Sequence, residues 1–284
     1  MLYKAFGGSC DKDAMACSVC RLLRSELAKV WRTKFPYLGL GASMLAALVA
    51  RQSTEVLSIR GELTASSYLT TSLNVCSTLV VPIFATIFAA MLVASESSRG
   101  TLRYVLTRPI SRSSFLSAKL LSGLFYLGML FAANLVLAIP IALQYPWRAA
   151  FDEGAPIPNP SEQVGIFAVA VALTIFSHVA TVCFGFFVSV LSVNVATAIG
   201  VAVGVLLSLL PVSVLLDFGD FKPGEWFFNS YWDTATAIAS DKVSGIYSSW
   251  NGPPVMALLA VCGLSSLVFL VAAYVIFNRR DLNI

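Results

Sequence analysis

A basic stretch with regularly placed polar residues lies between two long apolar segments, at Glu96–Lys119 (ESSRGTLRYVLTRPISRSSFLSAK). It carries one acid, Glu96, and five cations: Arg99, Arg103, Arg108, Arg112 and Lys119. Arg and Lys side chains donate charge-assisted hydrogen bonds to carboxylates and phosphates. A basic loop held against a membrane could therefore bind acidic groups of lipid headgroups or of a protein partner.

The order of residues in this stretch predicts two short helices joined by a corner. Ser95–Thr101 ends one apolar segment, where Gly100 could turn the chain into the loop by taking a positive φ. Leu102–Thr107 is a short amphipathic run that Arg108 and Pro109 interrupt. Ser111 can then cap a new helix that leads through Lys119 into the next apolar segment.

Catalytic motifs are absent from the sequence. It contains no G-x-x-x-x-G-K-[ST] phosphate loop, no HExxH, no GxSxG and no paired carboxylates within an apolar segment. We therefore expect the chain not to be an enzyme and to hold no cofactor of its own. Any energy source for its function would be another polypeptide.

The N-terminal cysteines could supply ligands for a metal ion. Cys10, Cys17 and Cys20 form C-x6-C-x2-C near the N-terminus, but a zinc site needs a fourth ligand, and the single histidine, His178, lies in an apolar segment. We favour free thiols and no metal. Three further cysteines, within apolar segments, are expected to pack as small apolar residues: Cys76, Cys183 and Cys262.

The elements that position the basic loop are predicted to be membrane-spanning helices. Of 284 residues 57% are hydrophobic and 12% charged, and the mean hydropathy is +0.80. About 20 apolar residues span a bilayer core as a helix. We identify six such segments and predict an all-α polytopic membrane protein: Pro36–Ala50, Leu69–Ala94, Leu120–Tyr145, Val164–Leu191, Val195–Leu216 and Pro254–Phe277.

Cation placement predicts the orientation of these spans. Of the 19 Lys and Arg residues, seven precede the first span, five lie in the basic loop and two follow the last span. With six spans, all of these fall on one side. We therefore expect a multi-pass protein of the cell membrane, with both termini and the basic loop in the cytoplasm.

The N-terminal 35 residues are predicted to form a cytoplasmic tail and an interfacial helix, followed by the transmembrane domain at 36–284. In CRLLRSELAKVWRTKF the apolar residues recur near helical spacing, which favours a helix lying on the membrane with its cations toward anionic lipid. Pro36 should separate this helix from the first span. Met15 offers an alternative start to the chain.

A long outer segment, 217–254, precedes the last span. Its aromatic residues recur near a 3.6-residue period, so an amphipathic helix is predicted from Gly224 or Glu225 onward. This helix could anchor the chain at the outer interface or gate a pathway. The residues expected to form the gate or interface are Trp226, Phe227, Tyr231 and Trp232.

Polar residues inside the spans are few, and none is a mid-span Asp, Glu, Lys or Arg. Ion-coupled carriers commonly place an ionisable group on the ion path, so the sequence disfavours that class. A lone histidine such as His178 more often hydrogen-bonds between helices than forms a site.

At the basic loop the sequence resembles the permease subunits of type-2 ATP-binding-cassette (ABC) exporters. Their hallmark is similar to E-x-x-x-G-T-L-R-x-x-L-x-x-P-x-S-R, followed by a Lys at the start of the third span. The layout of an interfacial helix, six spans and an outer aromatic region is similar too. The matching residues are Glu96, Gly100, Thr101, Leu102, Arg103, Leu106, Pro109, Ser111, Arg112 and Lys119.

The resemblance implies a coupling loop, 95–119, that docks on a separate ATPase subunit. It also implies two copies of that ATPase, which would hold ATP and Mg, and a second permease subunit, the same or related. Membrane lipid is a further expected partner, and nucleic acid is not. An ion-coupled secondary carrier and a non-transporting membrane scaffold or sensor stay open as alternatives, and the sequence leaves the substrate open.

Overall fold

The computed structural model describes residues 22–57, 64–100, 111–147, 158–215, 223–245 and 248–279. Every regular element within these ranges is helical, which confirms the predicted all-α class. A short helix, Leu22–Val30, precedes the elements of the main body. These are α2 (Phe35–Leu57), α3 (Ala65–Val75), η2 (Cys76–Val80), α4 (Val81–Ser98), α6 (Arg112–Ala142), α7 (Pro160–Leu191), α8 (Val195–Leu215), η3 (Pro223–Trp226), η4 (Phe228–Tyr231), α9 (Thr234–Val243) and α10 (Pro253–Arg279).

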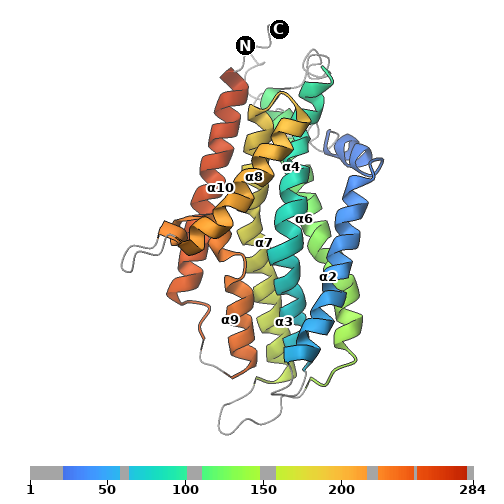
Figure 1. Ribbon diagram of the computed structural model, residues 1–284, viewed down its shortest axis with the longest axis vertical. Coiled ribbons are helices and arrows are strands. Elements are labelled where there is room, and N and C mark those ends of the chain that lie inside the picture. Colours follow the sequence, from blue (N-terminus) through green and yellow to red (C-terminus); the bar gives the residue numbers. More distant parts are fainter. Residues whose placement is uncertain are drawn as a thin grey trace, which may run out of the picture.

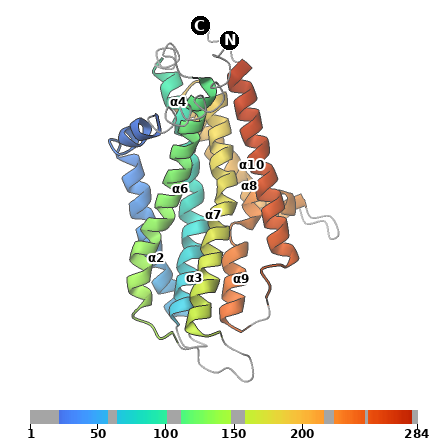
Figure 2. The ribbon, with the colours of Figure 1, turned by 180° about the vertical axis from the view of Figure 1, so that it is seen from behind.

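The long helices lie side by side and alternate in direction, as Figures 1 and 2 show from opposite sides. The short Leu22–Val30 helix lies at the side of the bundle, near one of its ends (Figure 1). The last turns of α4 and α10 and the first turn of α6 lie at this same end, which we call the basic end. Its described cations are Arg24, Lys29, Arg32, Lys34, Arg99, Arg112, Lys119 and Arg279.

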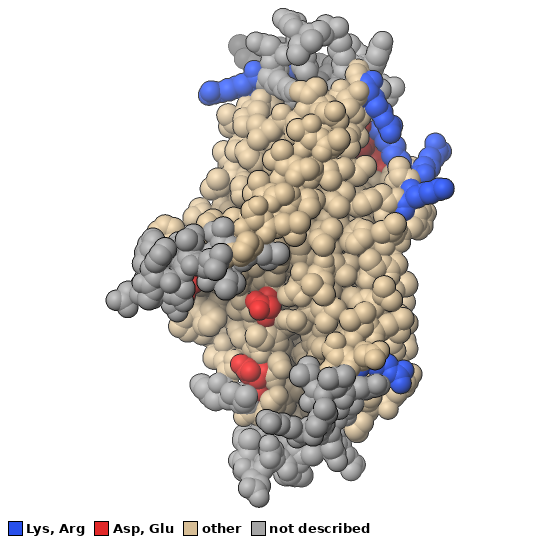
Figure 3. Space-filling view, viewed as in Figure 1, with Lys and Arg blue, Asp and Glu red and all other residues tan. Residues whose placement is uncertain are grey.

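Charge is distributed unevenly along the bundle. On the face drawn in Figure 3, Lys and Arg gather toward the basic end, and acidic side chains lie mainly toward the other half. The described elements of the opposite end carry the acids Glu162, Asp233 and Asp241, together with the cations Arg51 and Lys242. This is the asymmetry that the sequence predicted for a chain crossing a membrane.

Four of the described helices are long and apolar enough to cross a membrane: Ala65–Ser98, Arg112–Ala142, Pro160–Leu191 and Pro253–Arg279. A fifth span is present if Leu22–Val30 and Phe35–Thr54, which meet at 71°, are counted as one. The sequence predicted six. The other predicted spans are helical but fall short, because α2 ends in polar residues and Val195–Leu209 is a shorter apolar helix.

Helix starts follow local capping chemistry. The Thr64 hydroxyl accepts from the Ser67 amide at the start of α3. At α7, Pro160 occupies the first turn and the Asn159 amide donates to the Glu162 carboxylate at 3.1 Å. These side chains satisfy amides that the first helical turn leaves without partners.

The second apolar segment is one long helix interrupted at its middle. Pro82 cannot donate a backbone hydrogen bond, and it lies in the first turn of α4, directly after the π-helical segment η2. The Val81 amide donates to the Cys76 carbonyl, five residues back. The wider π turn thus joins α3 to α4 without ending the helix.

Small residues allow α4 and α7 to pack closely. A Cβ atom at Gly185 of α7 would lie 2.9 Å from both the Thr86 carbonyl oxygen and the Ala89 Cβ. One turn on, the Ser189 hydroxyl accepts from the Val93 amide at 2.9 Å. Small residues at helix contacts are typical of packing inside membranes, where close approach supplies dispersion energy.

Buried asparagines join helices within the bundle. Asn134 of α6 is fully buried, and its side-chain amide donates to the Ser43 carbonyl of α2 at 3.1 Å. Ser72 of α3 donates to the Asn134 carbonyl oxygen at 3.3 Å. Asn74 donates to the Thr236 hydroxyl at 2.8 Å, which links α3 to α9.

The outer segment differs from the single helix that was predicted from Gly224 or Glu225. It forms two short 3-10 turns, η3 and η4, and a regular helix begins only at Thr234. The aromatic residues explain the difference, because Phe228 and Trp232 are buried against α7, α8 and α10 while Trp226 is 74% exposed. Tight turns direct these bulky side chains to opposite sides.

Candidate functional site

The structure describes both ends of the predicted coupling loop. Glu96 belongs to the last turn of α4, Gly100 follows the C-cap of that helix, and Arg112 and Lys119 belong to the start of α6. Six predicted coupling residues lie outside the described residues: Thr101, Leu102, Arg103, Leu106, Arg108 and Pro109.

Two local predictions for the loop are confirmed. Gly100 has a φ of 67°, a left-handed conformation that favours glycine. Ser111 is the N-cap of α6, where its hydroxyl accepts from the Ser114 amide at 3.1 Å. The chain therefore leaves α4 and enters α6 through defined backbone geometry.

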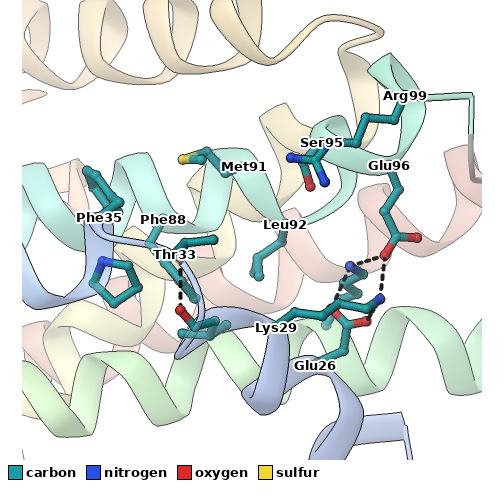
Figure 4. A pocket seen from close by; sticks show the side chains of 13 residues that line it. Glu26, Lys29, Thr33, Phe35, Phe88, Met91, Leu92, Ser95, Glu96 and Arg99 are labelled. Atoms are coloured by element: carbon teal, nitrogen blue, oxygen red, sulfur yellow. Dashed lines mark hydrogen bonds and ion pairs between the residues drawn. The ribbon is translucent and has the colours of Figure 1, made fainter.

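Four charged side chains meet at the base of the loop, in what we call the ion cluster: Glu26, Lys29, Glu96 and Lys119 (Figure 4). Lys119 Nζ lies 2.6 Å from Glu26 Oε2 and 2.6 Å from Glu96 Oε1. Lys29 Nζ contacts Glu26 Oε1 at 2.6 Å and Glu96 Oε1 at 3.2 Å. Two lysines and two carboxylates thus alternate around one closed ring of contacts.

Most of the ion cluster is buried. Lys119 is only 3% exposed and Glu96 only 8% exposed, whereas the Lys29 side chain is 59% exposed at the rim. Burial alone disfavours the charged Glu26 carboxylate, but Lys119 and Lys29 outweigh it, so the pKa of Glu26 lies below its ordinary value. Burial would lower the pKa of Lys29, yet the two carboxylates raise it.

The ion cluster joins three segments that are distant in the sequence. Glu26 comes from the Leu22–Val30 helix, Glu96 from α4 and Lys119 from α6. Removing one member of a buried ion pair leaves an uncompensated charge, so the three segments must stay together. A displacement of the loop would therefore be transmitted to all three.

The start of α6 is also attached to the end of α10. The Arg112 guanidinium donates to the Asn278 carbonyl at 3.1 Å. Ser117 and Tyr274 share a hydrogen bond of 2.7 Å between their hydroxyls, and Phe115 stacks on Phe277 with ring centroids 6.0 Å apart. The second flank of the loop is thus held by the last helix.

Sequence reasoning placed Glu96 and Lys119 in the loop as contacts for a partner and did not identify Glu26 or Lys29. Glu96 and Lys119 are buried against other parts of the chain, which gives them a structural role. Their contact with an ATPase stays a prediction. The missed signal was Glu26, a lone acid in a basic helix and three residues before Lys29.

A groove opens beside the ion cluster, between the Leu22–Val30 helix and α4. It has a volume of about 330 Å³. Figure 4 shows the charged residues toward one end of this groove and Phe35 and Phe88 toward the other. The described residues that line it are Glu26, Lys29, Val30, Thr33, Phe35, Pro36, Phe88, Met91, Leu92, Ser95, Glu96, Arg99 and Lys119.

The predicted outer gate residues do not form one surface. Trp226 is exposed and Phe227 is half-buried, whereas Tyr231 and Trp232 are buried. The Trp232 indole nitrogen donates to the Thr181 hydroxyl at 3.2 Å. The Trp232 ring also stacks on His178, with ring centroids 5.6 Å apart.

The expectation that His178 hydrogen-bonds between helices is wrong for the described residues. The residue is fully buried, and neither ring nitrogen has a hydrogen-bond partner among the described residues. The ring instead packs between Phe131 and Trp232.

No metal site is found in the described part of the chain, where no three His, Cys, Asp or Glu side chains are grouped to hold an ion. Cys76, Cys183 and Cys262 are free and buried, as predicted. The N-terminal Cys10, Cys17 and Cys20 lie outside the described residues.

The fold and the cation distribution define an all-helical protein of the multi-pass membrane type. The chain belongs to the DUF2705 family of proteins of unknown function, whose profile matches residues 44–283. The matched region includes Glu96 and Lys119 and begins after Glu26 and Lys29. No curated protein matches the chain.

Proposed function

We propose that this chain is the membrane-spanning permease subunit of an ATP-driven ABC exporter. Loop 95–119 would couple it to a separate ATPase subunit, two copies of which would hold ATP and Mg. A second permease subunit, identical or related, would complete the translocation path. The chain itself would not hydrolyse ATP, because it contains no phosphate loop.

The observation that carries this proposal is the anchoring of both flanks of the loop. Glu96 and Lys119 meet in the ion cluster, and Arg112 binds the end of α10. A loop that served only as an orientation signal would need cations but no such fixed base. A loop attached to the Leu22–Val30 helix, α4, α6 and α10 can transmit movement of a docked ATPase to the bundle.

The proposal includes six spans with both termini in the cytoplasm of a cell-membrane protein. Alternating helix directions support it, because α2, the α3–α4 helix, α6, α7, α8 and α10 run in turn toward opposite ends (Figure 1). Although α8 is short, η3, η4 and α9 extend from it toward the end opposite the basic end (Figure 2). Together these elements would complete the fifth crossing.

The direct test measures coupling to an ATPase that co-purifies with the chain. In a reconstituted complex, Arg103→Ala should lower ATPase binding about ten-fold, the expected effect of losing one charge-assisted contact. The matched control is Lys34→Ala, which removes an exposed cation at the same basic end. Both variants should reach the membrane at the wild-type level.

Three results would contradict the proposal. Wild-type ATPase binding by Arg103→Ala would make the loop an orientation signal only, as expected for a scaffold or sensor. ATP-independent transport by the purified chain would indicate a secondary carrier. ATP hydrolysis that persists in the stringently purified chain would exclude a separate energy-supplying subunit.

A further inference from the structure

We infer that the groove beside the ion cluster is a binding site for one phospholipid of net charge −1. Its headgroup would lie at Lys29 and Arg99, and an acyl chain would lie along Met91, Phe88 and Phe35. This inference rests on the membrane location of the chain and not on its coupling to an ATPase.

The shape of the groove fits a ligand with a polar and an apolar end. Its volume of about 330 Å³ falls within the usual range of small-ligand sites, about 300–1,000 Å³. Phe88 and Arg99 are eleven residues apart on α4, so they lie about 16 Å apart along the helix axis. The groove therefore has length for part of an acyl chain as well as a headgroup.

The charges at the groove favour one negative charge on the ligand. Three cations, Lys29, Arg99 and Lys119, face two carboxylates, Glu26 and Glu96, which leaves one positive charge unbalanced. Lys119 is buried between both carboxylates, so it is not accessible to a headgroup.

Two cations remain accessible to a headgroup. The Lys29 side chain is 59% exposed, and its ammonium group has three donors, of which the two carboxylates occupy two. Arg99 is exposed, and no hydrogen bond or ion pair joins its side chain to another residue of the described ranges. Arg99 lines the groove, and Figure 4 shows its side chain extending back along α4 toward Ser95.

The position of the groove distinguishes a lipid from a soluble anion. The apolar wall is formed by α2 and α4, which continue into the bundle, while the cations lie at the basic end. A phospholipid entering from the membrane would place its phosphate at the cations and its chain against the apolar wall. A free phosphate would leave that wall uncovered.

The test counts lipids bound to the full purified chain by native mass spectrometry. Phosphatidylglycerol should form a one-to-one adduct that survives detergent exchange, whereas zwitterionic phosphatidylcholine should not. Arg99→Gln should weaken phosphatidylglycerol binding about ten-fold, and Met91→Trp should abolish it by filling the groove. The matched controls are Arg24→Gln on the Leu22–Val30 helix and Leu45→Trp on the exposed face of α2, which should both bind normally.

Several outcomes would overturn the inference. Equal binding of both lipids, or undiminished phosphatidylglycerol binding by Met91→Trp, would mean that the groove selects no anionic lipid. Displacement of the lipid by millimolar glycerol phosphate would point to a soluble phosphate ligand. A photo-crosslinker at Thr33, on the groove wall, that captures only polypeptide would show that protein fills the groove.

Discussion

Lys119 satisfies two carboxylates in a site almost closed to water. Its ammonium group lies 2.6 Å from one oxygen of Glu26 and 2.6 Å from one of Glu96, and it also lies 5.4 Å from the centre of the Phe115 ring. Charges in such a site are stable only when they are paired, so each member depends on the others.

Replacing Lys119 with methionine should destabilise the protein by about 3–5 kcal/mol, because two buried carboxylates would lose their shared cation. Combining Lys119→Met with Glu26→Gln and Glu96→Gln should recover most of this loss by removing the charges together. Equilibrium unfolding in mixed micelles measures both effects. If the triple variant is no more stable than Lys119→Met, the ion cluster does not hold the three segments together.

The depressed pKa of Glu26 predicts a pH dependence of stability. Because the pKa is lower in the fold than its ordinary value of 4.5, the charge on Glu26 should stabilise the fold fully above that pH. This stabilisation should be lost as the pH falls through the pKa of the folded state. Thermal unfolding between pH 7 and pH 3 should therefore show a smaller decline for Glu26→Gln than for wild type.

The control for this pH series is Asp241→Asn, which removes one negative charge from an exposed position on α9. It breaks no contact of the ion cluster, so its unfolding should depend on pH as that of the wild type does. Identical pH profiles for Glu26→Gln and Asp241→Asn would show that the charge on Glu26 does not stabilise the fold.

At the scale of elements, close packing of α4 and α7 determines the centre of the bundle. Gly185 faces the backbone of α4. A Cβ added there would be fixed by the helix backbone, so no side-chain rotation could move it away from α4. Ser189 is also small, and its hydroxyl accepts hydrogen bonds from two amides of α4, those of Val93 and Ala94. The contact between α4 and α7 thus depends on small residues and on the Ser189 hydroxyl.

Gly185→Ala should destabilise the protein by about 1–3 kcal/mol, because the new Cβ would lie 2.9 Å from the Thr86 carbonyl oxygen and the helices would have to separate. Gly128→Ala on α6 is the matched control, since no atom lies within 4 Å of the added Cβ. It should stabilise α6 by about 0.5–1 kcal/mol. Equal unfolding midpoints for the two variants would show that α4 and α7 are not in close contact.

At the scale of the whole molecule, most of the described cations gather at one end (Figure 3), where the Leu22–Val30 helix, the loop flanks and the last turn of α10 also lie (Figure 1). Such an asymmetry orients a membrane protein with its basic end in the cytoplasm. The apolar residues exposed along α10, such as Leu264 and Leu267, would then face lipid or a second subunit.

The proposed orientation predicts the accessibility of single cysteines introduced into a cysteine-free variant. Ser161→Cys at the start of α7 should react with a membrane-impermeant maleimide added outside intact cells, and Ser113→Cys at the start of α6 should not. Both serines are exposed, so access depends only on the side of the membrane. Labelling of Ser113→Cys with protection of Ser161→Cys would reverse the topology.

The sequence by itself determined the helical class, the approximate bounds of the long helices and the local geometry of the loop flanks. These features depend on neighbouring residues: apolar runs predict helices in lipid, Ser111 caps the turn that follows it, and Gly100 allows a positive φ. The part of the loop between its flanks lies outside the described residues, so its two predicted helices stay predictions.

Only the tertiary structure decided which charged residues meet. Glu26 is 93 residues from Lys119, and no local pattern pairs them. The outer aromatic residues gave a helical period, yet burial of Trp232 against His178 selected two tight turns instead of one helix. Long-range packing determines these contacts, since a buried charge or a large ring must find a partner wherever in the chain that partner lies.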